Sequence, residues 1–581
     1  MRRRFQEGGP VRVLWEVSFE CGNKVGGIWT VITSKAPFMK KKFDGRYFTI
    51  GFLNPKRTEV IDRIPPPPFS DVFSKLGREG LEFRYGSWVD AGDTPIILVD
   101  ARGMLSKVNE IKAELWERYR IDSLGSGFDY NEPLAWSYGV GMLLRELSRA
   151  MPGEHVVQLR EWLSAGVLFY LDSASAKLPT VFTTHATVLG RATGGRIPPD
   201  PDSGARKHNV TAKHLTEKAA ARLATVFTTV SEGTGKEAEK VLGRAPDLIT
   251  YNALDDHSIP ELPKLMSDKV MFRQKIDDFV RSYFFPYYPL ELSDYPVVYT
   301  AGRYEFLNKG YDIFIDALGV LNERLKKEGY GKWFLSFILV PAGTLGVKDE
   351  VIQNFAFYRR MKEVLKEDVD RISKNLFMAG PGEGVAKKEH DVLLVDIGSM
   401  HFELFSRRGN NPLLCAFQLS GGSDKDAIMQ RLRSNGLLNR PEDRVKVVYY
   451  PVYLNKQDEL LGLRYRDFLT AASMGVFLSR YEPWGYTPME AAAFLSTAVT
   501  TRTAGFGMAA ERLGSKGIYV ADISESAAPR VAEIIENFVK SSKEVRISLE
   551  IAAHKAVKNH FIWEKLGDRY LKAYELALGR V

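Results

Sequence analysis

A chain of 581 residues is too long for one hydrophobic core, and 45% hydrophobic residues is ordinary for a soluble globular protein, so we expect two or more domains. The net charge of +8 is spread along the chain without a long basic block, which argues against nucleic acid as a partner, and no apolar run approaches the roughly 20 residues of a membrane span. Cys21 and Cys415, the two cysteines, cannot form a disulfide framework and lack metal-ligand spacing, which fits a reducing cytoplasm.

Short β-rich runs alternate with helical patterns along the whole chain, which is typical of parallel sheets with crossover helices. In the first half we predict strands at 11–17, 95–100, 155–159, 180–184, 225–230 and 248–251. In the second half we predict strands at 297–301, 334–340, 445–450, 475–479, 498–501 and 517–520. The aromatic, proline-containing stretch 284–296 separates the two sets, so we predict an α/β protein with two Rossmann-like domains facing each other across a cleft.

Two stretches interrupt this alternation. Between 349 and 376, apolar residues recur every three or four positions, which predicts a helix of about three heptads that forms a coiled-coil seam or lies on its own domain. The stretch 191–209 is rich in Gly, Pro and Asp and is typical of a mobile loop.

The segment YEPWGYTPME (481–490) places Glu482 and Glu490 on either side of a turn, between a strand-like run (474–479) and a helix-like run (489–495). Open α/β sheets hold ligands at such strand–turn–helix junctions, since the amides at the helix start are unpaired. Both carboxylates can face one crevice and accept hydrogen bonds from sugar hydroxyls. The alternative is a buried junction in which they serve only as cap and surface charge.

A second candidate is AGRYEFLNKG (301–310), where Arg303 and Lys309 follow the strand that ends near Ala301. A guanidinium fork and a compact ammonium together can neutralise a diphosphate, although such a pair is also common on solvated surfaces.

Glycines and a histidine complete the candidates. Gly26 and Gly27, after the first strand and beside Lys24, allow a backbone to approach phosphate oxygens, and TAGFG (503–507) could act similarly on the other wall. His185 follows the strand 180–184, a place where a lone histidine is often structural.

Four long segments, in this order, resemble the eukaryotic-type glycogen synthases, glycosyltransferase family 3. They are ECGNKVGGIWTVITSKAP (20–37), FTTHATVLGR (182–191), AGRYEFLNKG (301–310) and YEPWGYTPME with TTRTAGFG (500–507). Weaker similarity at 226–250 and 444–454 extends the likeness over nearly the whole chain. It implies the GT-B arrangement: an acceptor-side domain at 1–290, a nucleotide-sugar domain at 291–541 with a helical insertion at about 349–435, and a C-terminal helix at 542–581 that crosses back.

The resemblance also assigns roles to single residues. It implies that Arg303 and Lys309 stabilise the departing UDP, that His185 lies beside the transferred glucose, and that Glu482 contacts the glucose hydroxyls; these four form the catalytic set. The expected substrate- and nucleotide-binding residues are Lys24, Gly26, Gly27, Arg191 (a basic residue facing the cleft), Tyr465 (stacked on uracil), Tyr481, Trp484, Gly485, Tyr486, Thr487, Glu490 (on the ribose hydroxyls), Gly505, Phe506 and Gly507.

The activity implied is transfer of glucose from UDP-glucose, with ADP-glucose as an alternative donor, to the 4-hydroxyl of a glycogen or α-1,4-glucan end, with retention of configuration. No metal, cofactor or membrane is expected, and the helical insertion implies a homo-oligomer, with a tetramer favoured. Two alternatives stay open: another retaining GT-B transferase with a small acceptor, and a glycan-binding scaffold without turnover.

The chain departs from the family pattern at three places. Arg160, in QLREW, replaces the second histidine of the family's HFHEW, and Ala253, in NAL, replaces a glycine, which would be strained if its φ were positive. The stretch 544–561 offers only Arg546, Lys555 and Lys558 where regulated members carry an arginine cluster for glucose-6-phosphate. We therefore expect a short form with little or no activation by that effector.

Overall fold

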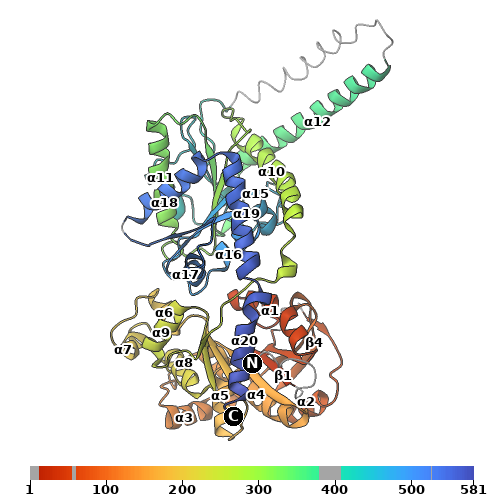
Figure 1. Cartoon of the computed structure of the whole chain (residues 1–581), viewed down its shortest axis with the longest axis vertical. Helices are drawn as coiled ribbons and strands as arrows, with labels where there is room; N and C mark the ends of the chain where they lie inside the picture. Colours follow the sequence, from red (N-terminus) through yellow and green to blue (C-terminus); the bar gives the residue numbers. More distant parts are fainter. Residues whose placement is uncertain (1–11, 55–59, 379–406, 459, 525) are drawn as a thin grey trace.

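The computed structural model describes residues 12–54, 60–378, 407–458, 460–524 and 526–581. Figure 1 shows two lobes, each built on a largely parallel sheet with helices packed against it, with the C-terminal helices α19 and α20 running from one lobe to the other. Within these residues, no helix combines the length and apolarity needed to cross a membrane.

The first lobe contains a nine-stranded sheet in the order β3-β4-β5-β2-β1-β6-β7-β8-β9. Its strands are β1 (Arg12–Val17), β2 (Tyr47–Phe52), β3 (Val60–Asp62), β4 (Glu82–Trp88), β5 (Thr94–Asp100), β6 (Glu154–Arg160), β7 (Thr180–Thr184), β8 (Val226–Thr229) and β9 (Leu248–Ile249). The pairs β3–β4 and β4–β5 are antiparallel, and the other pairs are parallel. The six strands predicted for this half are present, whereas β2, β3 and β4 were not predicted.

The helices of the first lobe are α1 (Gly27–Lys42), α2 (Phe69–Gly77), α3 (Val108–Tyr119), α4 (Phe128–Ala150), α5 (Gly166–Ser173), α6 (Val188–Thr193), α7 (Pro201–Lys207), α8 (Thr211–Leu223) and α9 (Glu232–Leu242). The stretch 191–209, predicted to be a mobile loop, contains the end of α6 and all of α7. Asp200 caps α7 by accepting the amides of Asp202 and Ser203, and Pro201 suits the first turn, so this part of the prediction was wrong.

The second lobe has a six-stranded, all-parallel sheet in the order β14-β11-β10-β15-β16-β17. Its strands are β10 (Val297–Ala301), β11 (Phe334–Leu339), β14 (Val445–Tyr449), β15 (Met474–Val476), β16 (Thr497–Thr501) and β17 (Ile518–Ala521), and β12 (Thr344–Val347) pairs with β13 (Phe417–Leu419) outside it. Its helices are α10 (Leu262–Phe284), α11 (Tyr311–Lys327), α14 (Ala427–Ser434), α15 (Tyr465–Ala471), α16 (Tyr486–Ala493), α17 (Gly505–Arg512) and α18 (Ala527–Lys540). The central strands β10 and β11 are buried along their whole length, as expected for a sheet covered on both faces.

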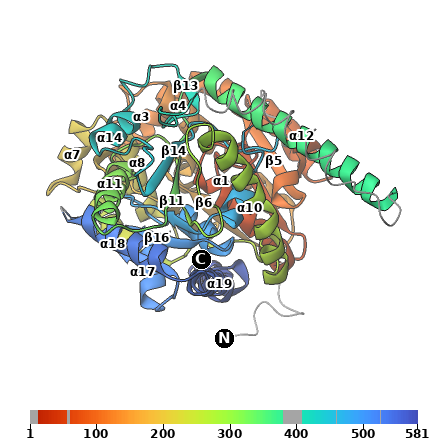
Figure 2. The same ribbon diagram turned by 90° about the horizontal axis from the view of Figure 1, so that it is seen from above.

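The helix predicted at 349–376 is α12 (Asp349–Met378). Val351 and Phe355 near its start are buried, and this end packs against α10, while Val369 further along is 58% exposed. In Figures 1 and 2 the far end of α12 projects beyond the second lobe. The rest of the predicted insertion up to residue 406 lies outside the described residues.

The chain passes between the lobes twice, and the two passages are hydrogen-bonded to each other. The Leu254 amide donates to the Phe561 carbonyl at 2.9 Å, and the Trp563 amide donates to the Leu254 carbonyl at 3.0 Å. We expected the first passage at 284–296. Helix α10 (Leu262–Phe284) already packs in the core of the second lobe, so the chain has crossed before α10 begins.

The C-terminal region forms two helices. Helix α19 (Lys543–His560) packs against α16 and β16 in the second lobe, and α20 (Trp563–Leu578) packs against α1 and strands β6 to β9 in the first. Ala253, beside the first passage, is absent from the described residues with positive φ, so its substitution for glycine causes no strain of that kind.

Candidate functional site

Two loops at the carboxyl end of the second sheet bring the first pair of predicted residues together. Lys309 lies on the loop after β10, and Glu482 lies on the loop after β15, a strand that pairs directly with β10. Lys309 Nζ is 2.6 Å from Glu482 Oε2, and the two side chains are 18% and 22% exposed. Ser479 Oγ donates to the same carboxylate oxygen at 3.3 Å. An ammonium and a carboxylate are therefore fixed side by side within reach of solvent.

Close packing of these two loops requires glycine at position 310. Gly310 has a φ of +67°, and a Cβ there would lie 2.1 Å from the Leu478 carbonyl oxygen. Arg480 joins the loops further, because its amide donates to the Asn308 carbonyl at 2.7 Å and its guanidinium binds both oxygens of Asp312 at 2.8 and 2.7 Å.

Arg303, on the same loop as Lys309, is 69% exposed and pairs with Glu305 at 2.8 Å. The hydroxyl of Tyr311 donates to the Arg303 carbonyl at 2.9 Å, which holds the backbone while the side chain stays accessible. The charge of Arg303 also acts on Glu20 of the first lobe and helps to lower the pKa of that carboxyl, which burial raises.

Glu490 and Tyr465 lie close to each other at the same end of the sheet. Glu490 is on α16, and burial raises its pKa although the charge of Arg466 acts to lower it. Tyr465 begins α15; burial raises its pKa, and Tyr299 and Glu490 add to the effect. The hydroxyl of Tyr465 is buried with no hydrogen-bond partner among the described residues, so one polar atom beside Glu490 is left without a protein partner.

The aromatic and glycine residues around Glu482 mainly support its loop. Trp484 is buried, stacks on Tyr251 with ring centroids 5.3 Å apart, and packs edge-on against Phe506. The Gly505 and Phe506 amides donate to the carbonyls of Glu482 and Trp484 at 3.3 and 2.8 Å. These two amides of the TAGFG segment are therefore engaged within the protein, and the expectation that the segment binds a phosphate stays a prediction.

Close packing against the backbone requires the glycines of that segment. A Cβ at Gly505 would lie 2.4 Å from the Pro483 carbonyl oxygen, and one at Gly507 would lie 2.3 Å from that of Thr501. Gly485, which precedes α16, has a φ of +103°, and the half-buried Thr487 follows in the first turn of that helix.

Two tyrosines of the YEPWGYTPME segment contact the first lobe. The Tyr481 hydroxyl donates to Glu237 Oε1 on α9 at 2.9 Å, and a Cβ at Gly195 would lie 2.8 Å from the Tyr481 ring. The Tyr486 hydroxyl lies 3.4 Å from the Ala253 carbonyl oxygen. The loop that carries Glu482 is thus held against the first lobe.

At the start of α1, the side chain of Glu20 takes the place where we expected a phosphate. Glu20 Oε2 accepts the Gly26 amide at 2.9 Å and the Trp29 amide at 2.8 Å, while no atom lies within 4 Å of a Cβ built at Gly27. Lys24 Nζ lies 4.7 Å from the centre of the Trp29 ring. Burial raises the pKa of Glu20, although these two amides and the charges of Arg191 and Arg303 act to lower it.

His185 lies at the carboxyl end of β7 and is buried. Its backbone amide donates to Glu161 Oε1 at 2.8 Å, and its ring Nε2 lies 2.8 Å from Arg160 Nη1. Arg191 on α6 is exposed, yet it lies among carboxylates. The surrounding protein takes water from its guanidinium, which acts to lower the pKa, but Glu161 and other acidic groups more than offset this, so the pKa of Arg191 is raised.

Sequence reasoning missed three carboxylates at the site: Glu20, Glu161 and Glu237. Glu20 and Glu161 lie inside segments that drew attention for other residues, and Glu161 has a φ of +63°, an uncommon conformation that clusters at functional sites. No pattern in the sequence marks any of them, because each acts by accepting amides or hydroxyls from segments far along the chain.

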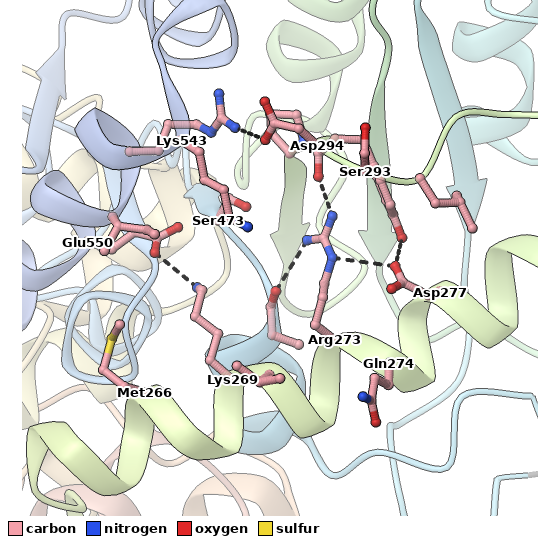
Figure 3. A pocket seen from close by; sticks show the side chains of 17 residues that line it. Met266, Lys269, Arg273, Gln274, Asp277, Ser293, Asp294, Ser473, Lys543 and Glu550 are labelled. Carbon is pink, nitrogen blue, oxygen red and sulfur yellow. Dashed lines mark hydrogen bonds and ion pairs between the residues drawn. The ribbon is translucent and has the colours of Figure 1, made fainter.

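A pocket of about 340 Å³ lies apart from all of these residues, between α10 and α19 (Figure 3). Two of its cations are already paired: Lys269 lies 3.2 Å from Glu550, and Arg546 pairs with Asp294. Arg273 lies 4.1 Å from the centre of the Tyr295 ring and donates to the Tyr295 carbonyl. None of the predicted site residues lines this pocket.

Comparisons with known proteins agree with the motifs. Residues 16–581 match the family described as glycogen synthase. "Glycogen [starch] synthase isoform 2" of Saccharomyces cerevisiae is 32% identical over 98% of this chain and 86% of its own, and the liver "Glycogen [starch] synthase" of Homo sapiens is 31% identical over 98% and 84%.

Among solved structures, the catalytic domain of starch synthase IV from Arabidopsis thaliana, bound to ADP and acarbose, aligns with a TM-score of 0.51 at 12% identity and covers 98% of this chain and 100% of that one. This likeness supports the α/β fold with two parallel sheets, the GT-B arrangement predicted from the sequence. With the family match over nearly its whole length, the chain belongs to the glycogen synthase family and is a glycosyltransferase.

Proposed function

We propose that this chain transfers glucose from UDP-glucose to the 4-hydroxyl of a glycogen or α-1,4-glucan end, with retention of configuration, and that ADP-glucose is an alternative donor. The single observation that carries the proposal is the pairing of Lys309 with Glu482 at 2.6 Å, on adjacent loops at the carboxyl end of the second sheet. A cation that can neutralise a phosphate and a carboxylate that can bind sugar hydroxyls then lie next to each other, as the two parts of one nucleotide sugar require.

In this reaction the acceptor oxygen forms a bond to the sugar C1 while the bond from C1 to the diphosphate oxygen breaks. Both electrons of the broken bond leave with the diphosphate, whose oxygen takes the acceptor's proton. Negative charge therefore grows on the diphosphate, where Lys309 and the exposed Arg303 stabilise it electrostatically. Glu482 keeps the role of holding glucose hydroxyls and is not assigned that of a nucleophile.

The remaining expected residues are distributed around this pair. Glu490 and Tyr465 would bind the ribose and the base, because the charge of Glu490 acts on the Tyr465 hydroxyl, which has no hydrogen-bond partner among the described residues. His185 and Arg191 would contact the sugar from the first lobe. Trp484, Gly505, Phe506 and Gly507 would act indirectly by holding the Glu482 loop in place.

The test measures radiolabelled glucose incorporated from UDP-glucose into ethanol-precipitable glycogen. Lys309→Ala, Arg303→Ala and Glu482→Ala should each lose roughly 10²- to 10³-fold in kcat, the usual cost of removing one group that stabilises transition-state charge. Lys558→Ala is a matched control for Lys309, since Lys558 is also 18% exposed and ion-paired, at 2.5 Å from Asp256. Arg433→Ala on α14 serves the same purpose for Arg303.

Three outcomes would contradict the proposal. Label found only in a soluble product would indicate a transferase with a small acceptor. Equal, slow release of nucleotide by wild type and all three variants would indicate a scaffold without turnover. Transfer from ADP-glucose alone in a panel of donors would exclude UDP-glucose.

The homo-oligomer, with a tetramer favoured, also stays a proposal. It is supported by α12, where Leu365 and Val369 are 38% and 58% exposed beyond the part that packs on α10. Light scattering after size-exclusion chromatography would test it, and a monomer at micromolar concentration would contradict it.

A further inference from the structure

Arg160 is a buried cation in direct contact with the ring of His185. It ends β6, which lies between β1 and β7 in the sheet, so Glu16 on β1 and His185 after β7 flank it. Arg160 is 1% exposed; its Nη1 lies 2.8 Å from His185 Nε2, and its Nε donates to Glu16 Oε1 at 2.6 Å. The guanidinium thus joins the imidazole to a carboxylate inside the first lobe.

The contact decides which ring nitrogen of His185 carries the proton. A guanidinium has five N–H donors and no acceptor, so Nε2 must be the accepting, unprotonated nitrogen. The proton of the neutral ring is then on Nδ1, for which the described residues provide no hydrogen-bond partner. We propose that Arg160 is a positioning residue that fixes His185 as the neutral Nδ1–H tautomer, so that the ring can only donate, through Nδ1–H, to a hydroxyl of the sugar. This role for His185 rests on the proposed function.

The other charges near His185 favour the same state. Arg191 on α6 and Arg160 are cations, and Lys35 on α1, whose own pKa burial lowers to about 7, is a cation in the lower part of the tested pH range. Glu161 is engaged with the backbone amides of His185 and Ala186 rather than with the ring. Burial and these three cations hold the pKa of His185 well below its usual range. Burial and the neighbouring cations thus both disfavour the imidazolium.

Arg160 itself is held tightly. Glu16 accepts hydrogen bonds from Arg160, from Lys35 at 2.9 Å and from the hydroxyl of Tyr47, and these partners lower the pKa of Glu16 to about 2 although burial opposes them. Tyr570 of α20 covers the cluster, with its ring centre 5.8 Å from Arg160 and 4.5 Å from Lys35 Nζ. A histidine at position 160, as in the family's HFHEW, could donate or accept, whereas arginine permits one arrangement only.

The direct test is histidine side-chain NMR on the uniformly ¹⁵N-labelled full chain, followed from pH 8 to pH 5.5. The chain has nine histidines, and a His185→Gln spectrum identifies the signal of His185. We expect an unprotonated Nε2, a protonated Nδ1 and no titration in this range. An Nε2–H tautomer, or a midpoint above pH 5.5, would overturn the proposal from the wild-type protein alone, whether or not any variant folds.

Arg160→Met removes the donor and the charge at similar side-chain volume. In this variant the pKa of His185 should rise by about one to three units, the usual effect of removing a charge at contact distance, so a titration should enter the measured range. Arg160→Lys, which keeps a donor and the charge, should restore the wild-type tautomer. Arg244→Met, which removes a first-lobe arginine bonded to Asp247 and to backbone carbonyls, is the matched control.

The kinetic arm separates positioning from simple structural support. The kcat of wild type should show no limb from His185 between pH 5.5 and 8, and that of Arg160→Met should fall by about tenfold per pH unit below the new midpoint. A variant that loses activity equally at every pH, with an unchanged His185 tautomer, would contradict the proposal. The spectra need no substrate, so a chain that shows the tautomer but transfers no glucose would refute the proposed function and leave this assignment of the tautomer intact.

Discussion

The hydrogen bond between Tyr481 and Glu237 joins the loop of Glu482 to the first lobe, and Tyr481→Phe removes it with little change in volume. The Tyr481 hydroxyl donates to Glu237 Oε1 at 2.9 Å. Thr187 would remain on the same oxygen, through its amide at 3.2 Å and its hydroxyl at 2.6 Å, so the carboxylate keeps two donors. The substitution therefore tests the contact between the lobes without leaving Glu237 unpaired.

Hydrogen bonds to charged groups contribute about 1.5–3 kcal/mol, which corresponds to a roughly 10- to 150-fold weaker preference for the lobe arrangement seen here. If the lobes must meet for Glu482 and His185 to contact one sugar, kcat/KM for the donor should fall by a similar factor. The thermal midpoint should change little, because the hydrophobic cores of both lobes keep all their contacts.

The assay compares kcat/KM for the donor and the radius of gyration from small-angle X-ray scattering in wild type, Tyr481→Phe and Tyr330→Phe. The last is a control, because Tyr330 donates to the Val539 carbonyl at 3.2 Å within the second lobe. We expect Tyr481→Phe alone to lose activity and expand. A kcat/KM within twofold of wild type would show that this hydrogen bond does not govern how the lobes meet.

Three further outcomes follow from the structure. Gly310→Ala, with φ at +67° and a Cβ 2.1 Å from the Leu478 carbonyl oxygen, should lose at least about tenfold in activity. The control Gly329→Ala, with φ at +66° and no atom within 4 Å of its Cβ, should show only backbone strain of about 1–2 kcal/mol in denaturant unfolding. Equal effects of the two substitutions would contradict this. Burial lowers the pKa of Lys35 from 10.5 to about 7, so between these pH values the unfolded chain binds more protons than the folded one. The free energy of unfolding of wild type should therefore rise relative to that of Lys35→Met from pH 7 towards pH 10. A difference that does not change with pH would refute this sign. Glucose-6-phosphate should activate little or not at all, because Arg546 is already bound to a carboxylate, and a several-fold rise in rate on adding it would overturn this expectation.

Strands whose apolar runs are bounded by clear turns could be predicted from the sequence. Strands that form mainly because neighbouring strands pair with them were missed. The strands 180–184 and 297–301 were predicted to the residue, because β-branched and aromatic residues fill them and polar turns follow. Strand β4 (Glu82–Trp88), EFRYGSW, carries charges and a glycine and is only partly buried, and pairing with both β3 and β5 stabilises it. The predicted strand 475–479 ends at Val476, since the following residues turn to carry Glu482.

The candidate site could be predicted as residues but not as contacts. Nothing in the pattern of alternating strands and helices reveals that β10 and β15 are neighbours, yet this adjacency brings together Lys309 and Glu482, which are 173 positions apart. The resemblance supplied both residues, and the strand order supplied the reason they meet. Arg160 differs from these two residues. The sequence showed only that it replaces a histidine of the family pattern, and its proposed role follows from the strands on either side of β6.

The start of α1 shows most directly why a motif is not yet a site. Two glycines before a helix indicate a place for phosphate, but the argument assumes that the helix start is vacant. Here Glu20 occupies it and takes the Gly26 amide, so an incoming diphosphate would meet a carboxylate before it met the helix. Under the proposed function, neutralisation of the diphosphate would then fall chiefly to Arg303 and Lys309 on the opposite lobe, and the charge of Arg303 already acts on Glu20. A diphosphate at this place would thus need the cationic loop of the second lobe to lie against the first, and the proposed donor binding would then depend on the meeting of the lobes.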